Sequence, residues 1–454
     1  MSLEDLIEQL KRSVVPTEEE QLRIREFADN LIYRLRSYFK DDSIDILLAG
    51  SFARGTNIKG SHDIDIFIRF PKVYTKDKLE EEVENAVRSI RNEDEIITKK
   101  YAEHPYIRLF SSRYSIYADI VPAYRIESTS ERGSAVDRTP FHNEFVNSRL
   151  SKEQKDDVRV LKYILKMNYL YGAEVRVKGF SGYLCELLIY HYEDIYKLID
   201  SFEKIKLPKI LDIANRREIE EYESFIKRFN SRFIVIDPTD RNRNVAANLS
   251  ESNLYKFSLL SAMLLREPSE KSLYLYSNEI KVKAESLCDL LDDLGLSSYV
   301  MSFDLNDIAE DILYEQIDRL ARFIKDKLIR EHFLPVAVIP DIIDKKGYVS
   351  IIVYDNESKS ILLDGPPLEL RAAAIDMLKS FDRNRSLIFI DNNKLRYIRS
   401  RSYRSAYELI NDKKILKEIK LKDIKKESLR VEMLCNMHNK VKISEGIVRA
   451  LSIL

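Results

Sequence analysis

The spacing of apolar residues at the start of the chain predicts a helix followed by a strand. Thr17 and Glu20 form the Ser/Thr-x-x-Glu pattern of a capping box. Apolar residues then recur every three or four positions, as on one face of a helix: Ile24, Ala28, Leu31, Leu35 and Tyr38. The apolar run 44–49 predicts the first strand, and the small residues of 50–56 predict a turn that opens a short helix.

The pattern continues in the same mixed manner to about residue 142. A second strand is predicted over 64–69, and composition and periodicity predict a helix over 76–91. Three strand-like runs with short turns between them follow within 95–121. We therefore predict a small mixed α/β head over residues 1–142.

Beyond the head the pattern becomes mainly helical and then mixed. Between 151 and 261, apolar residues recur at helical offsets. Later, helices alternate with apolar runs of strand type such as 348–354 and 386–390. The chain is thus interpreted as an α/β (α+β) protein, with a helical neck over 143–258 and an α/β body with an appended tail over 259–454.

The composition is that of a soluble, folded protein. The 454 residues are about three times the ~150 residues typical of one domain, and 44% hydrophobic with 33% charged residues exclude a largely disordered chain. The longest apolar runs fall far short of a membrane span. The acidic first residues do not form a secretion signal, so we expect a cytoplasmic protein that does not enter a membrane.

The three cysteines are Cys185, Cys288 and Cys435, which are far apart and form no CxxC pair. An odd number without close spacing argues against a disulfide framework and against a zinc module. We therefore expect three buried free thiols.

Positive charge is concentrated near the end of the chain. The net charge of −1 gives no overall attraction to nucleic acid, so such binding requires segregated charge. Residues 394–430 contain thirteen Lys and Arg against five Asp and Glu, a surplus of eight positive charges. Tyr397, Tyr403 and Tyr407 lie among them, a mixture suited to phosphates and to stacking on an exposed base. A solvated charged helix explains the lysine-rich part equally well.

Two acids alternate with isoleucines in the second predicted strand. Because side chains alternate faces along a strand, Asp63 and Asp65 share one face and the isoleucines share the other. Two such carboxylates repel each other unless they are solvated or neutralised by a cation. An all-carboxylate set of ligands suits Mg²⁺ or Mn²⁺. The alternative is a pair of ordinary edge-strand acids that face water.

A third acid and an upstream turn make the pattern more specific. Asp119 lies in a strand-like run that could pair beside the first acidic strand. Three acids on adjacent strands can hold two divalent ions. Gly50 and Ser51 directly follow the first strand, and a turn of backbone amides with a hydroxyl at a helix start can seat phosphates. Arg54 could add a positive charge there.

This combination resembles the signature of the DNA polymerase β-like nucleotidyltransferase superfamily. Further segments resemble the archaeal, class I CCA-adding enzymes and occur in that family's order: 50–56, 119–124, 137–142, 157–162, 179–187 and 243–250. We match no specific motif after Ser250. The Arg-Arg-Asp and Glu-Asp-x-x-Arg template motifs of the bacterial and eukaryotic class are not found in matching positions.

The resemblance implies roles for the matching residues. Asp63, Asp65 and Asp119 would hold two Mg²⁺ ions, with Mn²⁺ as an alternative, and Asp119 would lie nearest the tRNA 3′-hydroxyl. The family often has Glu at the position of Asp63, a shorter acid that we expect to serve. The nucleotide phosphates would be held by Ser51, Arg54, His142, Lys162 and Tyr171. Taken singly, the last three also fit a capped loop residue, a solvated helix position and a core aromatic.

Arg243 is the candidate for base selection. By resemblance, Arg243 would act with the tRNA backbone as the surface that replaces a template, and Arg241 is the neighbouring alternative. A guanidinium could donate to acceptors on cytosine and adenine that guanine and uracil do not present in the same place. The other reading is a surface Arg paired with Asp237 or Asp240.

The resemblance thus implies an enzyme, a CCA tRNA nucleotidyltransferase that takes tRNA, CTP and ATP as substrates. A terminal ribose hydroxyl would attack the α-phosphorus of the nucleotide, and pyrophosphate would leave. One alternative is a poly(A) polymerase or a small-molecule nucleotidyltransferase. Another is an RNA-binding protein that has the fold without catalysis.

Overall fold

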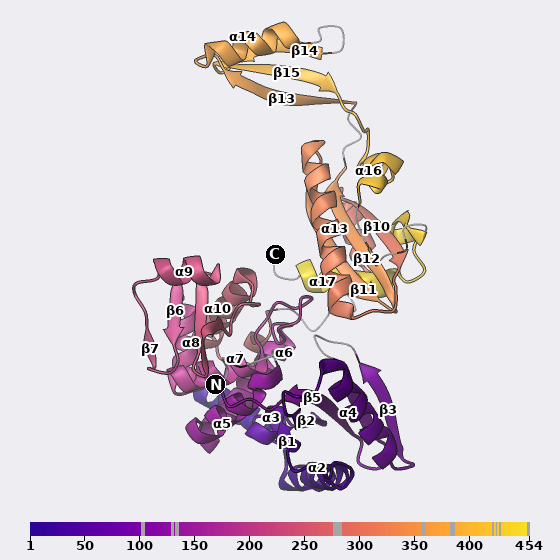
Figure 1. Cartoon of the computed structure of the whole chain (residues 1–454). Coiled ribbons are helices and arrows are strands. Elements are labelled where there is room, and N and C mark those ends of the chain that lie inside the picture. Colours follow the sequence, from indigo (N-terminus) through magenta and orange to yellow (C-terminus); the bar gives the residue numbers. More distant parts are fainter. Residues whose placement is uncertain are drawn as a thin grey trace. The chain divides into compact units, whose positions relative to one another are not determined.

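The chain forms two compact units, Met1–Tyr276 and Ser277–Leu454, which are described separately (Figure 1). The computed structural model describes residues 1–100, 105–128, 131, 136–275, 284–355, 359–381, 386–419, 422, 423, 425 and 428–451. Within these residues, no helix has both the length and the apolar character that crossing a membrane requires. The finer division at residues 142 and 258, like the cytoplasmic location, stays a prediction.

The first sheet of the first unit carries the candidate acids. The elements around it are α1 (Leu3–Val14), α2 (Glu18–Tyr38), β1 (Asp45–Ala49), α3 (Gly50–Arg54), β2 (Asp63–Phe70), α4 (Lys76–Ile90), β3 (Glu95–Lys100), β4 (Tyr106–Ser111) and β5 (Ile116–Tyr124). The strand order is β1-β2-β5-β4-β3, and the pair β2 and β5 is parallel while its neighbours are antiparallel. Ile64, Ile66 and Ile68 are buried in one cluster with residues of α2 and α4. The apolar face predicted for the second strand is confirmed.

The rest of the first unit combines helices with a second sheet. Its elements are η2 (Val136–Arg138), α5 (Thr139–Arg149), α6 (Lys152–Met167), α7 (Gly182–Tyr192), α8 (Ile195–Glu203), β6 (Lys209–Asp212), β7 (Arg217–Glu218), α9 (Glu223–Phe229), β8 (Phe233–Asp237), β9 (Asp240–Asn244), α10 (Glu251–Arg266) and η3 (Lys271–Leu273). The strands are ordered β7-β6-β8-β9. Helical spacing did not predict this sheet, because β8 is a short, fully buried apolar run that periodicity cannot distinguish from a helix segment.

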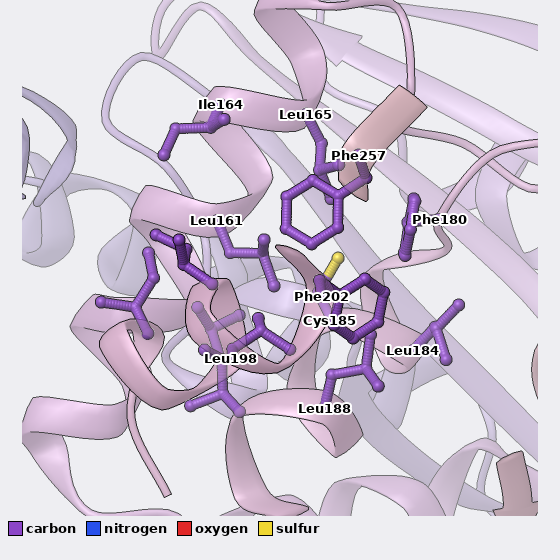
Figure 2. Packing of buried hydrophobic residues seen from close by; sticks show 14 of the residues in the cluster. Leu161, Ile164, Leu165, Phe180, Leu184, Cys185, Leu188, Leu198, Phe202 and Phe257 are labelled. Carbon is purple, nitrogen blue, oxygen red and sulfur yellow. The ribbon is translucent and has the colours of Figure 1, made fainter. Parts of the chain in front are cut away.

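The helices of this region meet in one hydrophobic core. Figure 2 shows Leu161 and Leu165 of α6 and Leu184 of α7 around the aromatic rings of Phe202 and Phe257. The centroids of these two rings are 5.0 Å apart, in an edge-to-face arrangement. The helical offsets seen in the sequence therefore mark the buried faces of α6 and α7.

The second unit contains two sheets. Its elements are α12 (Leu287–Asp293), β10 (Ser297–Asp304), α13 (Glu310–Arg330), β11 (Leu334–Ile343), β12 (Lys346–Tyr354), β13 (Ser360–Pro367), α14 (Arg371–Ser380), β14 (Ser386–Asp391), β15 (Lys394–Ser400), α15 (Ala406–Ile410), α16 (Lys413–Glu418), β16 (Arg430–Met433), η5 (Leu434–Asn436) and α17 (Lys440–Leu451). The larger sheet, β11-β12-β10-β16, packs one face on α13 and the other on α12 and α17. The smaller sheet, β13-β15-β14, lies along α14 (Figure 1). The strands predicted at 348–354 and 386–390 are confirmed.

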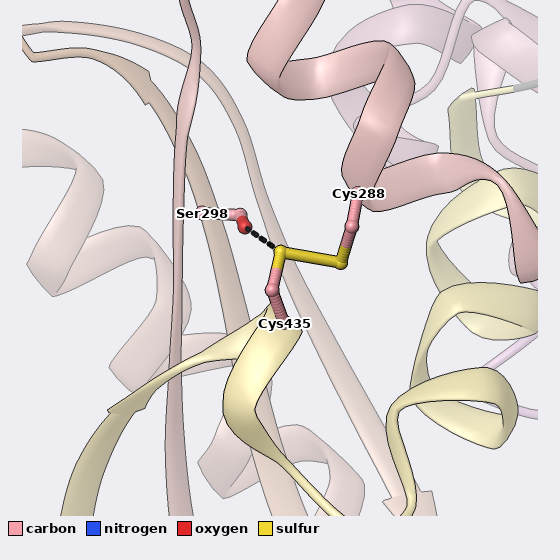
Figure 3. The surroundings of a disulfide bond; sticks show 3 residues. All are labelled: Cys288, Ser298 and Cys435. Atoms are coloured by element: carbon pink, nitrogen blue, oxygen red, sulfur yellow. Dashed lines mark hydrogen bonds between the residues drawn. A yellow bond between two sulfur atoms is a disulfide. The ribbon is translucent and has the colours of Figure 1, made fainter.

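A disulfide joins two segments of the second unit. Cys288 of α12 and Cys435 of η5 are bonded, with Cα atoms 5.8 Å apart and the hydroxyl of Ser298 near Cys435 (Figure 3). The prediction of three free thiols is therefore wrong for these two, and Cys185 alone is a free, buried thiol. The bonded residues lie 147 positions apart. They meet because β16, which precedes Cys435, pairs with β10, a long-range contact that spacing in the sequence does not show.

Reduction of this disulfide is expected to lower the free energy of unfolding of the second unit by about 2–4 kcal/mol, because the bond restricts the unfolded chain. Denaturant unfolding of the full chain with and without dithiothreitol measures the change. In the variant Cys288→Ser/Cys435→Ser, dithiothreitol should have no effect. An equal response of the native protein and this variant would contradict the prediction.

Candidate functional site

The three acids lie on one face of two adjacent strands. Because β2 and β5 run in parallel, Asp65 is the direct register partner of Asp119, and Asp63 is the partner of Tyr117. Asp63 is exposed, while Asp65 and Asp119 are half-buried. The structure therefore brings Asp65 and Asp119 side by side, with Asp63 two residues before Asp65 on the same face.

The turn after β1 lies against Asp65. Ala49, the last residue of β1, is the register partner of Asp65. The next residue, Gly50, has φ +73°, and a Cβ atom added to it would lie 1.7 Å from Oδ2 of Asp65. Glycine is required here both for the backbone conformation and for the close approach. Ser51 follows in the first turn of α3, so the candidate phosphate seat is next to the acids.

Arg108 was not predicted as a site residue, yet it holds both oxygens of Asp119. Its Nε donates to Oδ1 and its Nη2 to Oδ2, each at 2.7 Å. The guanidinium also lies over the ring of Tyr117, 5.5 Å from the centroid. Arg108 belongs to β4, where it is the register partner of Asp119. The sequence predicted strands in this region but not that β4 pairs with β5.

Burial and the neighbouring like charges perturb Asp65. Burial and then the charge of Asp119 raise the pKa of Asp65 to about 6; Asp63 adds to this effect, while Arg54 and Arg108 oppose it. Such repulsion is relieved by a bound cation, and three carboxylates provide the oxygen ligands that Mg²⁺ prefers. Across the described ranges, no three His, Cys, Asp or Glu side chains are already gathered as a metal cage. Asp119 contacts the cation of Arg108 instead. The three carboxylates are nevertheless ligands of the type that a divalent ion prefers, so these residues fit such an ion in their chemistry.

Arg54 and Lys162, the two cations expected to bind phosphate, both lie against the buried carboxylate of Glu186. Nε of Arg54 donates to Glu186 at 3.0 Å, and Nη1 donates to Asn143 at 3.0 Å. Nζ of Lys162 donates to the carbonyl and hydroxyl oxygens of Thr56, at 3.1 and 3.0 Å, and lies 3.5 Å from Glu186. Lys162 is only 2% exposed, so it is not a solvated helix position. Glu186 escaped sequence analysis because one acid in an apolar helix gives no signal of its partners.

Tyr171 lies beside the same cluster. A Cβ atom added to Gly182 would lie 2.9 Å from the Tyr171 hydroxyl and 3.6 Å from Nζ of Lys162, so both groups approach the same backbone position. Burial raises the pKa of Tyr171 well above its ordinary value, which keeps the phenol a donor. The structure therefore brings Tyr171 and Lys162 together.

His142 and Arg243 meet at a second buried carboxylate, Asp237. Nε2 of His142 lies 3.2 Å from Asp237, and Nη1 of Arg243 donates to the same oxygen at 2.9 Å. The His142 ring stacks on Tyr183 with centroids 3.9 Å apart. The pairing of Arg243 with Asp237 that was an alternative is thus present. It places Arg243 beside another candidate site residue.

Arg241 has different surroundings. Its Nη2 donates to Asp212 at 3.3 Å, and its side chain is 68% exposed, against 30% for Arg243. Because Arg243 and not Arg241 shares a carboxylate with His142, the geometry favours Arg243 as the arginine of the site.

Substitution of Glu186 by glutamine is expected to lower the free energy of unfolding by about 3–5 kcal/mol, because it leaves two buried cations without their shared counter-ion. Denaturant unfolding measures this loss. Glu193→Gln is the matched control: this acid follows α7, is exposed, and pairs with Lys197 on the surface. It should cost about 1 kcal/mol or less. Equal losses for the two variants would contradict the role given to Glu186.

Three family models match the chain. The nucleotidyltransferase domain matches residues 29–142, the second domain of tRNA nucleotidyltransferase matches 156–274, and the C-terminal domain of the CCA-adding enzyme matches 295–433. The CCA-adding enzyme of Methanocaldococcus jannaschii is 32% identical over 424 residues, which cover 91% of each chain. The chain belongs to the CCA-adding enzyme family. The CCA-adding enzyme of Archaeoglobus fulgidus is 35% identical over 336 residues, 74% of this chain and 72% of that one.

Membership of the CCA-adding enzyme family confirms the resemblance to the archaeal, class I enzymes and the expectation of a nucleotidyltransferase. The third family model covers the part of the chain after Ser250, where no motif was matched. A solved structure of the Cid1 poly(U) polymerase is also similar, at 15% identity and a TM-score of 0.47, over 59% of this chain and 94% of that one.

Proposed function

We propose that this CCA-adding enzyme adds C, C and A to the 3′ end of tRNA, with CTP and ATP as substrates. The terminal ribose hydroxyl attacks the α-phosphorus of the bound nucleotide, the bond to the β-phosphate breaks, and pyrophosphate leaves. The observation that carries the proposal is the parallel pairing of β2 and β5, which sets Asp65 directly beside Asp119.

Asp63, Asp65 and Asp119 hold two Mg²⁺ ions in this proposal, with Mn²⁺ as an alternative. When bound, the ions lower the pKa of the attacking hydroxyl and stabilise the departing pyrophosphate. Asp119 faces the acceptor end, and Arg108 fixes the orientation of its carboxylate through two hydrogen bonds. The repulsion between Asp65 and Asp119 supports a cation between these strands.

In this proposal, the nucleotide lies between the residues that contact Glu186 and those that contact Asp237. Ser51, Arg54, Lys162 and Tyr171 surround the phosphates, and His142 makes a further contact with the nucleotide. Among the described residues, Nη2 of Arg54 has no partner, so it is available to a phosphate oxygen. Lys162 has acceptors in Thr56 and Glu186 and must exchange one of them to reach a phosphate. Arg243 reads the base.

The decisive experiment is nucleotide incorporation. The protein is incubated with Mg²⁺, labelled CTP and ATP, and tRNA that lacks its CCA end. Label should enter this tRNA and stop after the final A, and absence of label would overturn the proposal. An unstructured RNA with a free 3′ end is the control. Repeated addition of A alone to that RNA would identify a poly(A) polymerase instead.

The basic segment of the second unit is proposed to hold the tRNA. Within residues 394–430, Arg399, Arg404 and Lys413 are exposed. Arg401 is different, since its Nη2 donates to the carbonyl of His332 at 3.0 Å and it is only half exposed. Three other charged residues of this segment, Lys420, Lys426 and Glu427, lie outside the described residues.

Reversal of the charges of Arg399, Arg404 and Lys413 to Glu is expected to weaken tRNA binding and to reduce the slope of log K against log salt by about one for each phosphate that the protein no longer neutralises. Binding titrations at several salt concentrations measure both quantities.

The matched control reverses three exposed cations that take part in surface ion pairs, Lys204, Arg322 and Lys346. The change in net charge is the same, so only a difference between the two triple variants locates the tRNA contact. Equal weakening in both would show that total charge, and not this segment, governs binding.

A further inference from the structure

Asp237 collects hydrogen bonds from several elements at the end of β8. It is fully buried. Its Oδ2 contacts Nε2 of His142 at 3.2 Å and accepts from Nη1 of Arg243 at 2.9 Å. Its Oδ1 accepts from the backbone N–H of Thr239 at 2.9 Å, from the Thr239 hydroxyl at 2.8 Å and from the Tyr183 hydroxyl at 3.3 Å. Both oxygens are therefore fixed in direction.

The charge of Asp237 determines what His142 offers to a ligand. Burial opposes that charge, but the hydrogen bonds from His142, Thr239 and Arg243 outweigh it and hold the pKa of Asp237 well below its usual range. An ionised carboxylate only accepts hydrogen bonds, so Nε2 of His142 must carry a proton. Burial keeps the pKa of His142 below its ordinary value, so the ring is neutral at pH 7.5. Nδ1, which has no partner in the described chain, is then a hydrogen-bond acceptor, so it can contact a donor of the nucleotide, such as a hydroxyl or amino group, and not a phosphate oxygen as the resemblance implied.

Asp237 also fixes the direction of Arg243. The carboxylate holds Nη1, whereas Nε and Nη2 have no partner among the described residues. A planar guanidinium held at one nitrogen can present only its remaining edge to a base. Without this anchor, the long side chain could adopt several rotamers and offer its donors to acceptors in different places.

We propose that Asp237 is a positioning residue for nucleotide selection. Through one carboxylate oxygen, Asp237 sets the tautomer of His142 and the direction of Arg243. The proposal rests on the proposed function, since it concerns how CTP and ATP are distinguished from UTP and GTP. Asp237 touches no reacting atom. It connects Arg243, which reads the base, to His142, which contacts the nucleotide.

The test is Asp237→Asn, which keeps the shape and removes the charge. If the amide oxygen stays with Thr239 and Tyr183, the amide N–H groups face His142 and Arg243, where acceptors are needed. The ratio of kcat/KM for CTP over UTP is expected to fall about ten- to a hundredfold, the discrimination typical of one well-placed base contact. The affinity for tRNA should stay unchanged.

Asp240→Asn is the matched control, because Asp240 is a buried acid of the neighbouring strand that pairs with Arg138 at 3.4 Å instead. It should leave the CTP/UTP ratio within about twofold. An unchanged ratio in Asp237→Asn, or an equal fall in both variants, overturns the proposal. If Asp237→Asn does not fold, Arg243→Lys replaces it, since lysine keeps the charge without the fixed fork and should lose the same discrimination.

A second measurement needs no catalysis. In the unmodified enzyme without nucleotide, ¹⁵N NMR of labelled histidine, assigned with His142→Gln, should show His142 at pH 7.5 with its proton on Nε2. In Asp237→Asn the proton should move to Nδ1. A proton on Nδ1 in the unmodified enzyme overturns the inference. Failure of the proposed function is a separate result, because it would appear as lack of incorporation into tRNA whatever the tautomer.

Discussion

Replacement of Asp119 by alanine should abolish nucleotidyl transfer and leave tRNA affinity nearly unchanged. Asp119 is the register partner of Asp65. Its loss removes one of the three carboxylates proposed to hold the metals, and the one proposed to lie nearest the acceptor hydroxyl. We expect the single-turnover rate to fall by at least about 1,000-fold, as for other groups that act only in the transition state. The side chain of Arg108 is 33% exposed and can be solvated when its partner is removed, so the fold should persist.

Asp45→Ala is the control for this variant. Asp45 belongs to β1 of the same sheet and pairs with Arg69, without a role in the proposed site. Its rate should stay within about twofold of the unmodified enzyme, because partly exposed ion pairs contribute little. If Asp119→Ala kept a tenth of the activity, the catalytic assignment would be wrong. If tRNA affinity fell in parallel with the rate, Asp119 would have a structural role.

The second large effect is expected from Gly50→Ala. A Cβ atom here would lie 1.7 Å from Oδ2 of Asp65, so the carboxylate has to move by about 1 Å or more. Displacement of a catalytic group by that distance typically lowers the rate about 100-fold. The positive φ of +73° adds about 1–2 kcal/mol of backbone strain. Single-turnover rates and denaturant unfolding separate the two effects.

Gly60→Ala is a close control. Gly60 has φ +77°, nearly the same backbone strain, but a Cβ atom there meets nothing within 4 Å. The variant should therefore lose about 1–2 kcal/mol of stability and keep its transfer rate. A similar fall in rate for both variants would show that strain, and not the position of Asp65, limits the reaction.

The sequence predicted those parts of the site that depend on local pattern. Alternation along one strand placed Asp63 and Asp65 on the face opposite the buried isoleucines, and small residues marked the turn at Gly50. Periodicity also located the strand that carries Asp119. These features depend on residues close in sequence, which one chain is sufficient to show.

The parts that were missed depend on contacts between distant segments. Arg108 belongs to the candidate site only because β4 pairs with β5, and Glu186 only because α7 packs beside α3 and α6. Asp237 was considered only as a partner of Arg243, because two of its other partners come from α5 and α7, which are distant in sequence. Glu186 and Asp237 are fully buried acids, and the burial of a single acid cannot be predicted from a sequence without knowledge of its neighbours.

The bond between Cys288 and Cys435 encloses the whole of the smaller sheet, β13-β15-β14, in one covalent ring. A protease that cleaves a loop of that sheet opens the ring without dividing the molecule. The two fragments stay attached, so the cut protein keeps its full mass under oxidising conditions and separates into pieces only after a reductant is added. The basic residues of β15 thus remain covalently attached to the rest of the second unit even when the chain that carries them has been broken.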